Sequence, residues 1–234
     1  MWKIMKKSMM LVAVVMLLLT FEVQAIDVDF YSDATIQDGD LYDLVRLYDT
    51  PPDHTTVDMT GGFVHNLWSY DSSIINMTDG EILTLETRST SNANISGGNV
   101  RSVFTWDHTT TNLYNGGSVF SLGAGVSGTI NMMGGNTEYL RAGDFSIVNL
   151  FGGTVNIYLN AWDSAIVNIY GYGFDYDPIS GNWNGGQLMG FWLDDTPFII
   201  DLAGSGTYSH INLIPEPGSL ILCALGALLV RRKK

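Results

Sequence analysis

Acidic side chains are the candidate metal ligands of this chain. Three sets stand out: Asp38, Asp40 and Asp43; Asp194 and Asp195; and a column spaced 18 or 19 residues apart, Asp71, Ser89, Asp107, Gly125, Asp144 and Asp163. Carboxylate oxygens are the ligands that calcium prefers, so calcium is the cofactor to consider. None of the sets has the ligand spacing of a known calcium loop, and Ser89 and Gly125 interrupt the column. Turn chemistry, in which Asp and Ser bond their own backbone, therefore explains the column better.

Catalytic groups form no constellation in the sequence. The four histidines, His54, His65, His108 and His210, lack the spacing of a metal site. Some β-helix enzymes cleave acidic polysaccharide with a lysine or arginine base, but Arg88 and Arg101 stand at different offsets in neighbouring repeats. Carboxylate pairs can hydrolyse glycosides, yet abundance alone identifies no pair. The sequence predicts no catalytic residue and no enzyme, and polysaccharide cleavage is kept as an alternative.

The excess of acidic residues limits the kinds of molecule that this chain is expected to bind. The whole chain has 24 acids against 11 lysines and arginines, a net charge of −13. Between residues 27 and 214 four arginines (Arg46, Arg88, Arg101 and Arg141) face 22 acids, a net charge of −18. Such a field repels nucleic acid and anionic polysaccharide, so neither is expected as a partner. The single cysteine, Cys223, lies near the C-terminus, so this part of the chain has no disulfide.

An internal repeat must position these side chains. Its unit is an Asn or Asp between two mostly apolar residues, and its central residues are 18, 18, 18, 19, 18 and 19 positions apart: Asp58, Asn76, Asn94, Asn112, Asn131, Asn149 and Asn168. A turn containing glycine and a second alternating stretch, such as 154–159, follow each unit. Helical periodicity is missing from this region. The pattern predicts an all-β protein, a parallel β-solenoid (β-helix) with about 18 residues per coil.

Alternation predicts that the Asn/Asp column faces outward, because its flanking residues are apolar. The outward triplets run from Thr56-Asp58-Thr60 to Ile166-Asn168-Tyr170 and grade from polar to aromatic. A ladder of stacked amides is the first interpretation of this column. The alternatives are a threonine array that binds ice and an aromatic and amide strip, including Phe151 and Tyr170, that binds neutral glycan.

Both ends of the chain have the features of export and sorting signals. Lys3, Lys6 and Lys7 precede an apolar run from Met9 to Leu19, and Ala25 offers a signal-peptidase cleavage site. At the other end, Pro215-Glu216-Pro217 leads to an apolar run, 220–230, which is expected to form a hydrophobic helix. Four cations complete the tail: Arg231, Arg232, Lys233 and Lys234. The apolar run is shorter than the roughly 20 residues that span a bilayer comfortably.

This three-part tail resembles the PEP-CTERM sorting signal of Gram-negative bacteria, a motif that is also labelled ice-binding protein C-terminal. The resemblance covers residues 214–234 and implies an exosortase as a partner, transient contact with the inner membrane, and an association with extracellular polysaccharide. The expected organisation is a signal peptide (1–25, a helix), N-terminal cap coils (26–55), regular repeats (56–171), C-terminal cap strands (172–213) and the sorting signal (214–234).

The C-terminal cap strands hold two tryptophans with two interpretations. Trp183 and Trp192 could cover the last coil of the solenoid or form a ligand patch. Taken together, the sequence predicts an exported, non-enzymatic structural or adhesive protein. It would be anchored in the membrane by its tail and then placed at the cell surface or in the extracellular matrix. Neutral-glycan binding is the alternative function, followed by polysaccharide cleavage and ice binding.

Overall fold

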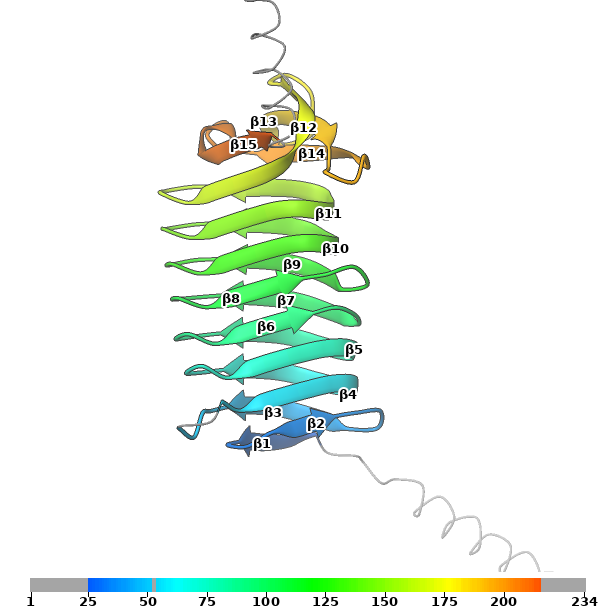
Figure 1. The fold of residues 1–234 in the computed structure, drawn as a ribbon, viewed down its shortest axis with the longest axis vertical. Helices are drawn as coiled ribbons and strands as arrows, with labels where there is room; N and C mark the ends of the chain where they lie inside the picture. The colour runs from blue at the N-terminus through cyan, green and yellow to red at the C-terminus, as the bar shows by residue number, and fades with distance from the viewer. Residues whose placement is uncertain (1–24, 52–53, 216–234) are drawn as a thin grey trace, which may run out of the picture.

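The computed structural model describes residues 25–51 and 54–215. The expected signal helix and the expected C-terminal helix lie outside the described residues, as do Glu216, Pro217 and the four terminal cations. The described chain forms a tall stack of β-coils (Figure 1). Its elements are β1 (Ile26–Phe30), β2 (Ala34–Ile36), β3 (Leu41–Leu47), β4 (Thr56–Ser69), β5 (Ile74–Thr87), β6 (Asn92–Ile95), β7 (Asn99–Thr105), β8 (Thr110–Leu113), β9 (Ser118–Ala124), β10 (Thr129–Ala142), β11 (Ile147–Ala161), β12 (Ile166–Asp177), β13 (Asn184–Phe191), β14 (Pro197–Ala203), the 3-10 helix η1 (Thr207–His210) and β15 (Ile211–Pro215).

The parallel β-solenoid predicted from the repeat is confirmed. Each coil contributes two strand segments, which pair in parallel with the same segments of the coils above and below. In β4, β5, β10 and β11 one long strand runs around the glycine corner and supplies both segments. In the middle coils the segments are separate strands, β6 with β7 and β8 with β9 (Figure 1). We call the surface of the first segments the ladder face and that of the second segments the opposite face.

The core lies between the two faces. Along the first segment of β5, Ile75 and Met77 are fully buried while Asn76 between them faces outward. Period-two alternation therefore separates core from surface, as the repeat pattern indicates. Near the aspartate turns, hydroxyl pairs replace aliphatic contacts inside the coil, as between Thr105 and Thr111, 2.7 Å apart. These two hydroxyls satisfy each other, whereas the buried Ser146 hydroxyl beside the Asp144 turn has no hydrogen-bond partner among the described residues.

The turn after each second segment contains a residue with positive φ. The residues are Asp71, Ser89, Asp107, Val126, Asp144 and Asp163. Five of them belong to the column expected from the sequence, but the fourth position is Val126 and not Gly125. The extra residue of this coil lies between Leu113 and Ser118, since Leu113 pairs 18 residues back with Ile95 and Ser118 pairs 19 back with Asn99. That insertion shifts the turn by one position.

The N-terminal residues already form a coil. Strand β2 pairs with β4, which places Thr35 beside Asp58, and β3 pairs with the second half of β4. Asp49 links this coil to the next, because its carboxylate accepts the amide hydrogens of Thr55 and Ser72, each at 3.0 Å. Burial would raise the pKa of Asp49, but the Thr55 amide, the His54 ring and the Ser72 amide together lower it from the ordinary 3.8.

The C-terminal end departs from the regular coil. Strands β12, β13 and β14 form an antiparallel meander, after which β15 returns to pair in parallel with β12. Trp192 is buried here, with its ring 4.2 Å from Phe198 and its indole N–H donating to the carbonyl of Gly153 at 3.1 Å. The meander thus closes the open end of the apolar core. Across residues 25–51 and 54–215 no helix is long and apolar enough to cross a membrane.

Candidate functional site

The repeated asparagines lie in one column on the ladder face. Each side-chain N–H donates to the side-chain oxygen one coil before it, at 2.8 to 3.1 Å. The column contains Asp58, Asn76, Asn94, Asn112, Asn131, Asn149, Asn168 and Asn212. Sequence reasoning missed its last member, Asn212 of β15. The Asp58 carboxylate accepts at the N-terminal end, so the amides form one directed chain along the stack.

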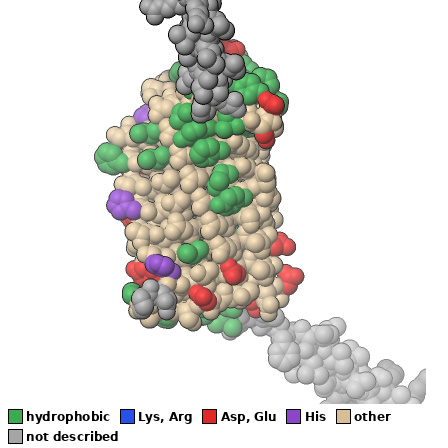
Figure 2. All heavy atoms as spheres, in the orientation of Figure 1, with side chains coloured by type: hydrophobic (Ala, Val, Ile, Leu, Met, Phe, Trp, Pro, Cys, Tyr) green, Lys and Arg blue, Asp and Glu red, His purple; other side chains and the backbone are tan. Residues whose placement is uncertain are grey.

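The ladder face changes character along its length. Near the N-terminus its outward residues are polar except for Ile74, whereas Met133, Ile147 and Ile166 are exposed hydrophobic residues further along. Phe151 and Tyr170 stack there with ring centroids 4.2 Å apart and an interplanar angle of 16°. In Figure 2 hydrophobic side chains gather over the C-terminal coils, whereas acidic side chains appear near both ends of this face. A regular threonine array would need one residue type along the whole face, and the aromatic and aliphatic residues interrupt it.

The opposite face carries a second row of aromatic rings, which the sequence did not reveal. Phe120, Tyr139, Tyr158 and Trp183 follow one another along the stack with centroid separations of 5.2, 4.9 and 5.1 Å. We call these four residues the aromatic column. Neighbouring rings tilt or meet edge to face, a favourable arrangement for aromatic pairs. The column presents a continuous aromatic surface to solvent, with Phe120 49% and Trp183 43% exposed.

Arg141 holds the middle of the aromatic column in place. Its guanidinium lies 5.1 Å from the Tyr139 ring centroid and 5.5 Å from that of Tyr158. It donates to the Ser121 hydroxyl at 2.9 Å and to the Tyr158 hydroxyl at 2.7 Å. Cation–π attraction and two hydrogen bonds therefore fix a cation on an otherwise acidic body.

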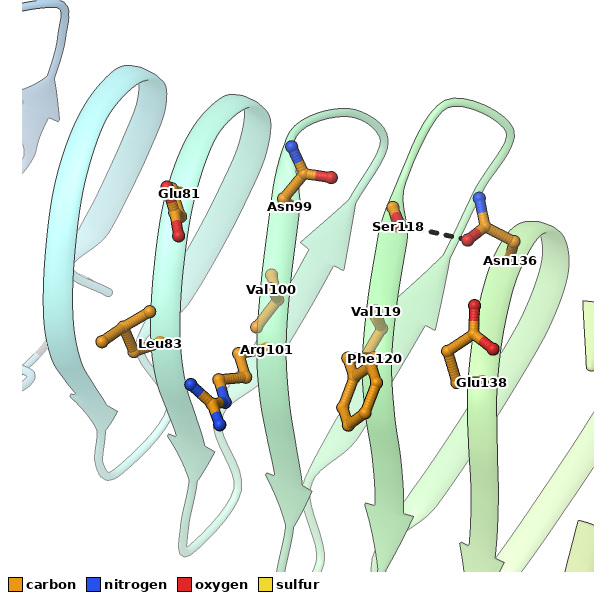
Figure 3. Close-up of a pocket in the computed structure, with 10 residues that line it drawn as sticks. All are labelled: Glu81, Leu83, Asn99, Val100, Arg101, Ser118, Val119, Phe120, Asn136 and Glu138. Carbon is orange, nitrogen blue, oxygen red and sulfur yellow. Dashed lines mark hydrogen bonds between the residues drawn. The ribbon is translucent and has the colours of Figure 1, made fainter. Parts of the chain in front are cut away.

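A groove of about 400 Å³ lies beside Phe120 on this face. Figure 3 shows Arg101, Phe120 and Glu138 on successive strands, with Asn99 and Asn136 above them. Within the described chain the Arg101 side chain makes no ion pair or hydrogen bond, whereas Arg46 pairs with Asp29 and Arg88 with Glu86, each at 2.7 Å. The groove thus offers an uncommitted donor beside an aromatic ring and two amides.

The carboxylates of the groove are poorly placed for glycoside hydrolysis. In the strand register Glu81 pairs with Asn99, Asn99 with Ser118, and Ser118 with Asn136. Glu81 therefore lies three coils from Asn136. Three coil steps amount to about 14 Å, and Glu138 lies on the same coil as Asn136. Paired glycosidase carboxylates stand about 5 to 10 Å apart, so Glu81 and Glu138 do not form such a pair.

Several of the other acids singled out in the sequence accept backbone amide hydrogens. Asp40 accepts the Gln37 amide at 2.9 Å, and Asp194 accepts the Thr196 amide at 3.0 Å. The Thr196 amide and hydroxyl lower the pKa of Asp194. Asp107 accepts the Ser89 amide at 3.1 Å, so it bonds the turn of the preceding coil and not its own backbone as the turn chemistry expected. In the residues that the structure describes, no three His, Cys, Asp or Glu side chains are grouped so that they could hold a metal ion.

The two tryptophans expected to act together lie in different places. Trp192 closes the core, whereas Trp183 belongs to the aromatic column. The histidines are also dispersed: His54 bonds Asp49, His65 bonds Asp43 and His210 bonds the Ala165 carbonyl, at 3.0 to 3.1 Å. Comparison with protein-family models, with curated proteins and with solved structures finds no match to this chain.

Proposed function

We propose that this protein is an exported, non-enzymatic structural or adhesive rod of the cell surface or extracellular matrix. The observation that carries the proposal is the amide ladder, which runs without a break from Asp58 to Asn212. A parallel stack whose coils are hydrogen-bonded through both backbone and side chains resists bending and unstacking. Such a rod suits a load-bearing or spacing role.

Sorting through the tail is part of this proposal. Support comes from the Pro215-Glu216-Pro217 tripeptide, the apolar run and the terminal cations, together with the resemblance to PEP-CTERM signals. An exosortase and the inner membrane would then be transient partners. The test is the location of tagged protein in a Gram-negative host that makes an exosortase, with and without residues 216–234. We expect the full chain at the cell surface and the shortened chain in the periplasm or medium. Identical distributions would refute the sorting role.

Neutral-glycan binding is the second candidate, and the aromatic column favours it. Exposed rings can stack on the apolar faces of sugar rings, and the adjacent groove supplies amide and guanidinium donors. The test is retention of the full-length protein on insoluble neutral polysaccharide. Retention that disappears on Phe120→Ala with Trp183→Ala would support this function. The matched control is Phe151→Ala with Tyr170→Ala, which removes two rings from the ladder face.

The same experiment separates the remaining alternatives. Release of reducing ends from the polysaccharide would indicate cleavage, and thermal hysteresis would indicate ice binding. Equal retention of the parent and of both double variants would exclude a specific role for either aromatic surface. The structural proposal would survive that result, because it depends on the ladder and not on a ligand.

A further inference from the structure

A second cavity, of about 260 Å³, lies on the opposite face where the strands approach the aspartate turns. Its walls are Phe104 and Trp106 on one side and Trp162 on the other, with Arg141 and Asp144 between them. We call it the Trp106–Trp162 cavity. It is smaller than the roughly 300 Å³ at which pockets for drug-sized ligands begin, so it fits about one ring.

Missing side chains create this cavity. Phe104 and Arg141 both pair with Gly123, which lies on the coil between them. Trp106 lies over Gly125 of that coil, because a Cβ there would come within 2.4 Å of the indole Cζ3. Trp162 lies over Gly143 one coil further, where a Cβ would meet its Cζ2 at 2.5 Å. The two indoles therefore lean toward each other from opposite ends of the cavity.

Polar groups with unused hydrogen-bonding capacity line the same space. Arg141 uses two of its five N–H donors on Ser121 and Tyr158, which leaves three for a ligand. The Oδ2 atom of Asp144 accepts the Val126 amide at 3.0 Å. Its Oδ1 atom has no hydrogen-bond donor among the described residues. A fixed donor and a free acceptor thus stand between aromatic walls.

We propose that the Trp106–Trp162 cavity binds one neutral pyranose ring of a glycan. Aromatic walls match the C–H faces of a sugar, while Arg141 and Asp144 match its hydroxyl groups. The body's charge of −18 opposes a uronate or sulfated sugar, so the ring is neutral. This inference rests on the glycan-binding candidate above and adds the position and chemical class of one subsite.

Gly123→Val is the decisive variant. The backbone of Gly123 is extended, and an added Cβ meets only the Val103 carbonyl oxygen at an ordinary 3.7 Å, so the fold accommodates a side chain there. Valine would project between Phe104 and Arg141 and fill the cavity. Trp162→Ala is the second variant, because it removes one wall at a side chain that is 41% exposed. Thr84→Val, at an outward position of β5 on the same face, is the matched control.

The experiment titrates full-length protein, in a detergent without a sugar headgroup, with neutral cello-, manno-, xylo- and chito-oligosaccharides. Calorimetry and saturation-transfer NMR measure binding, with oligogalacturonate as the anionic counterpart. We expect at least one neutral oligosaccharide to bind, oligogalacturonate to bind more weakly, and Thr84→Val to match the parent. Gly123→Val and Trp162→Ala should each weaken binding about tenfold or more.

Three results would overturn the proposal. If no neutral oligosaccharide binds at millimolar concentration, both the subsite and the glycan-binding candidate fail. If Gly123→Val binds like the parent while Phe120→Ala with Trp183→Ala does not, the glycan site is the aromatic column and only the subsite fails. If tryptophan-containing peptides occupy the cavity in preference to sugars, the occupant is an aromatic side chain of another protein.

Discussion

Each internal asparagine of the ladder makes two side-chain hydrogen bonds. In the middle of the stack, Asn112 donates to the Oδ1 atom of Asn94 at 2.8 Å and accepts from the Nδ2 atom of Asn131 at 2.9 Å. All three side chains are partly buried against their neighbours. Loss of one amide therefore leaves an unpaired acceptor on one side and an unpaired donor on the other.

Asn112→Ala should lower the free energy of unfolding by about 1 to 3 kcal/mol, because each of the two bonds contributes about 0.5 to 1.5 kcal/mol. Urea unfolding measures the change, and hydrogen exchange should show the greatest loss of protection in β6, β8 and β10. Thr110→Ala is the control, since it lies on the same strand and face and makes no side-chain hydrogen bond. If both variants lose the same stability, the ladder bonds contribute nothing beyond strand propensity.

The ladder also shows what sequence can predict at this scale. Seven positions followed from a period of 18 or 19 residues and apolar flanking residues. Asn212 did not, because it bonds Asn168 across 44 residues and the meander interrupts the period. Only the local Ile211-Asn212-Leu213 pattern marks it as a ladder residue.

Among structural elements, the aspartate turns are the most uniform: Ser89 replaces aspartate at one of them, and Val126 is the one apolar residue in this set. It occupies the left-handed region with φ of 54° and is 44% exposed. For a β-branched residue this conformation is strained, at a cost of order 1 to 3 kcal/mol, whereas Asn and Asp tolerate it. Little apolar burial compensates the strain at this exposed corner.

Val126→Asn should therefore raise the free energy of unfolding by about 1 kcal/mol. Asparagine is preferred to aspartate here because Asp107 and Asp144 occupy the same column on the adjacent coils. Thermal or urea unfolding against the parent checks the sign. Val119→Asn is a contrasting change, because that valine is only 1% exposed and its replacement should destabilise the protein. A neutral or destabilising effect of Val126→Asn would show that the corner does not store this strain.

The aspartate turns and the Trp106–Trp162 cavity show which features of the structural elements could not be predicted from the sequence. Strand identity followed from alternation, but the shift from Gly125 to Val126 depends on where the coil accommodates its extra residue. The Trp106–Trp162 cavity depends on Gly123 and on Gly125 and Gly143, over which the two indoles from other coils lie. That relation joins residues about 18 positions apart, and an outward glycine looks like an ordinary turn residue in the sequence. The antiparallel meander was likewise expected only as irregular cap strands.

At the scale of the whole molecule, the two ends of the described stack differ. The meander covers the core at the C-terminal end, with Trp192 and Phe198 inside it. At the N-terminal end β1 pairs only with β3 and β2 only with β4, so each strand has one free edge within the described residues. Free edges invite pairing with another chain unless something opposes it. Here the opposing feature is the set of exposed acids of the first coil, Asp27, Asp29, Asp33, Asp38 and Asp43, of which Asp29 pairs with Arg46 and Asp43 bonds His65.

We predict that these acids keep rods from joining through their N-terminal ends. Asp27→Asn with Asp38→Asn should increase self-association at low ionic strength, because it removes two like charges from the end of the rod. Sedimentation velocity measures the effect. For the parent, association should rise with salt toward ~0.15 M and above, where the screening length falls to about 8 Å. Asp71→Asn with Glu81→Gln is the matched control, since it removes the same charge at β4 and β5, whose strands are paired on both sides. Equal association of the two double variants would mean that net charge, and not the charge at the strand edge, keeps the rods apart.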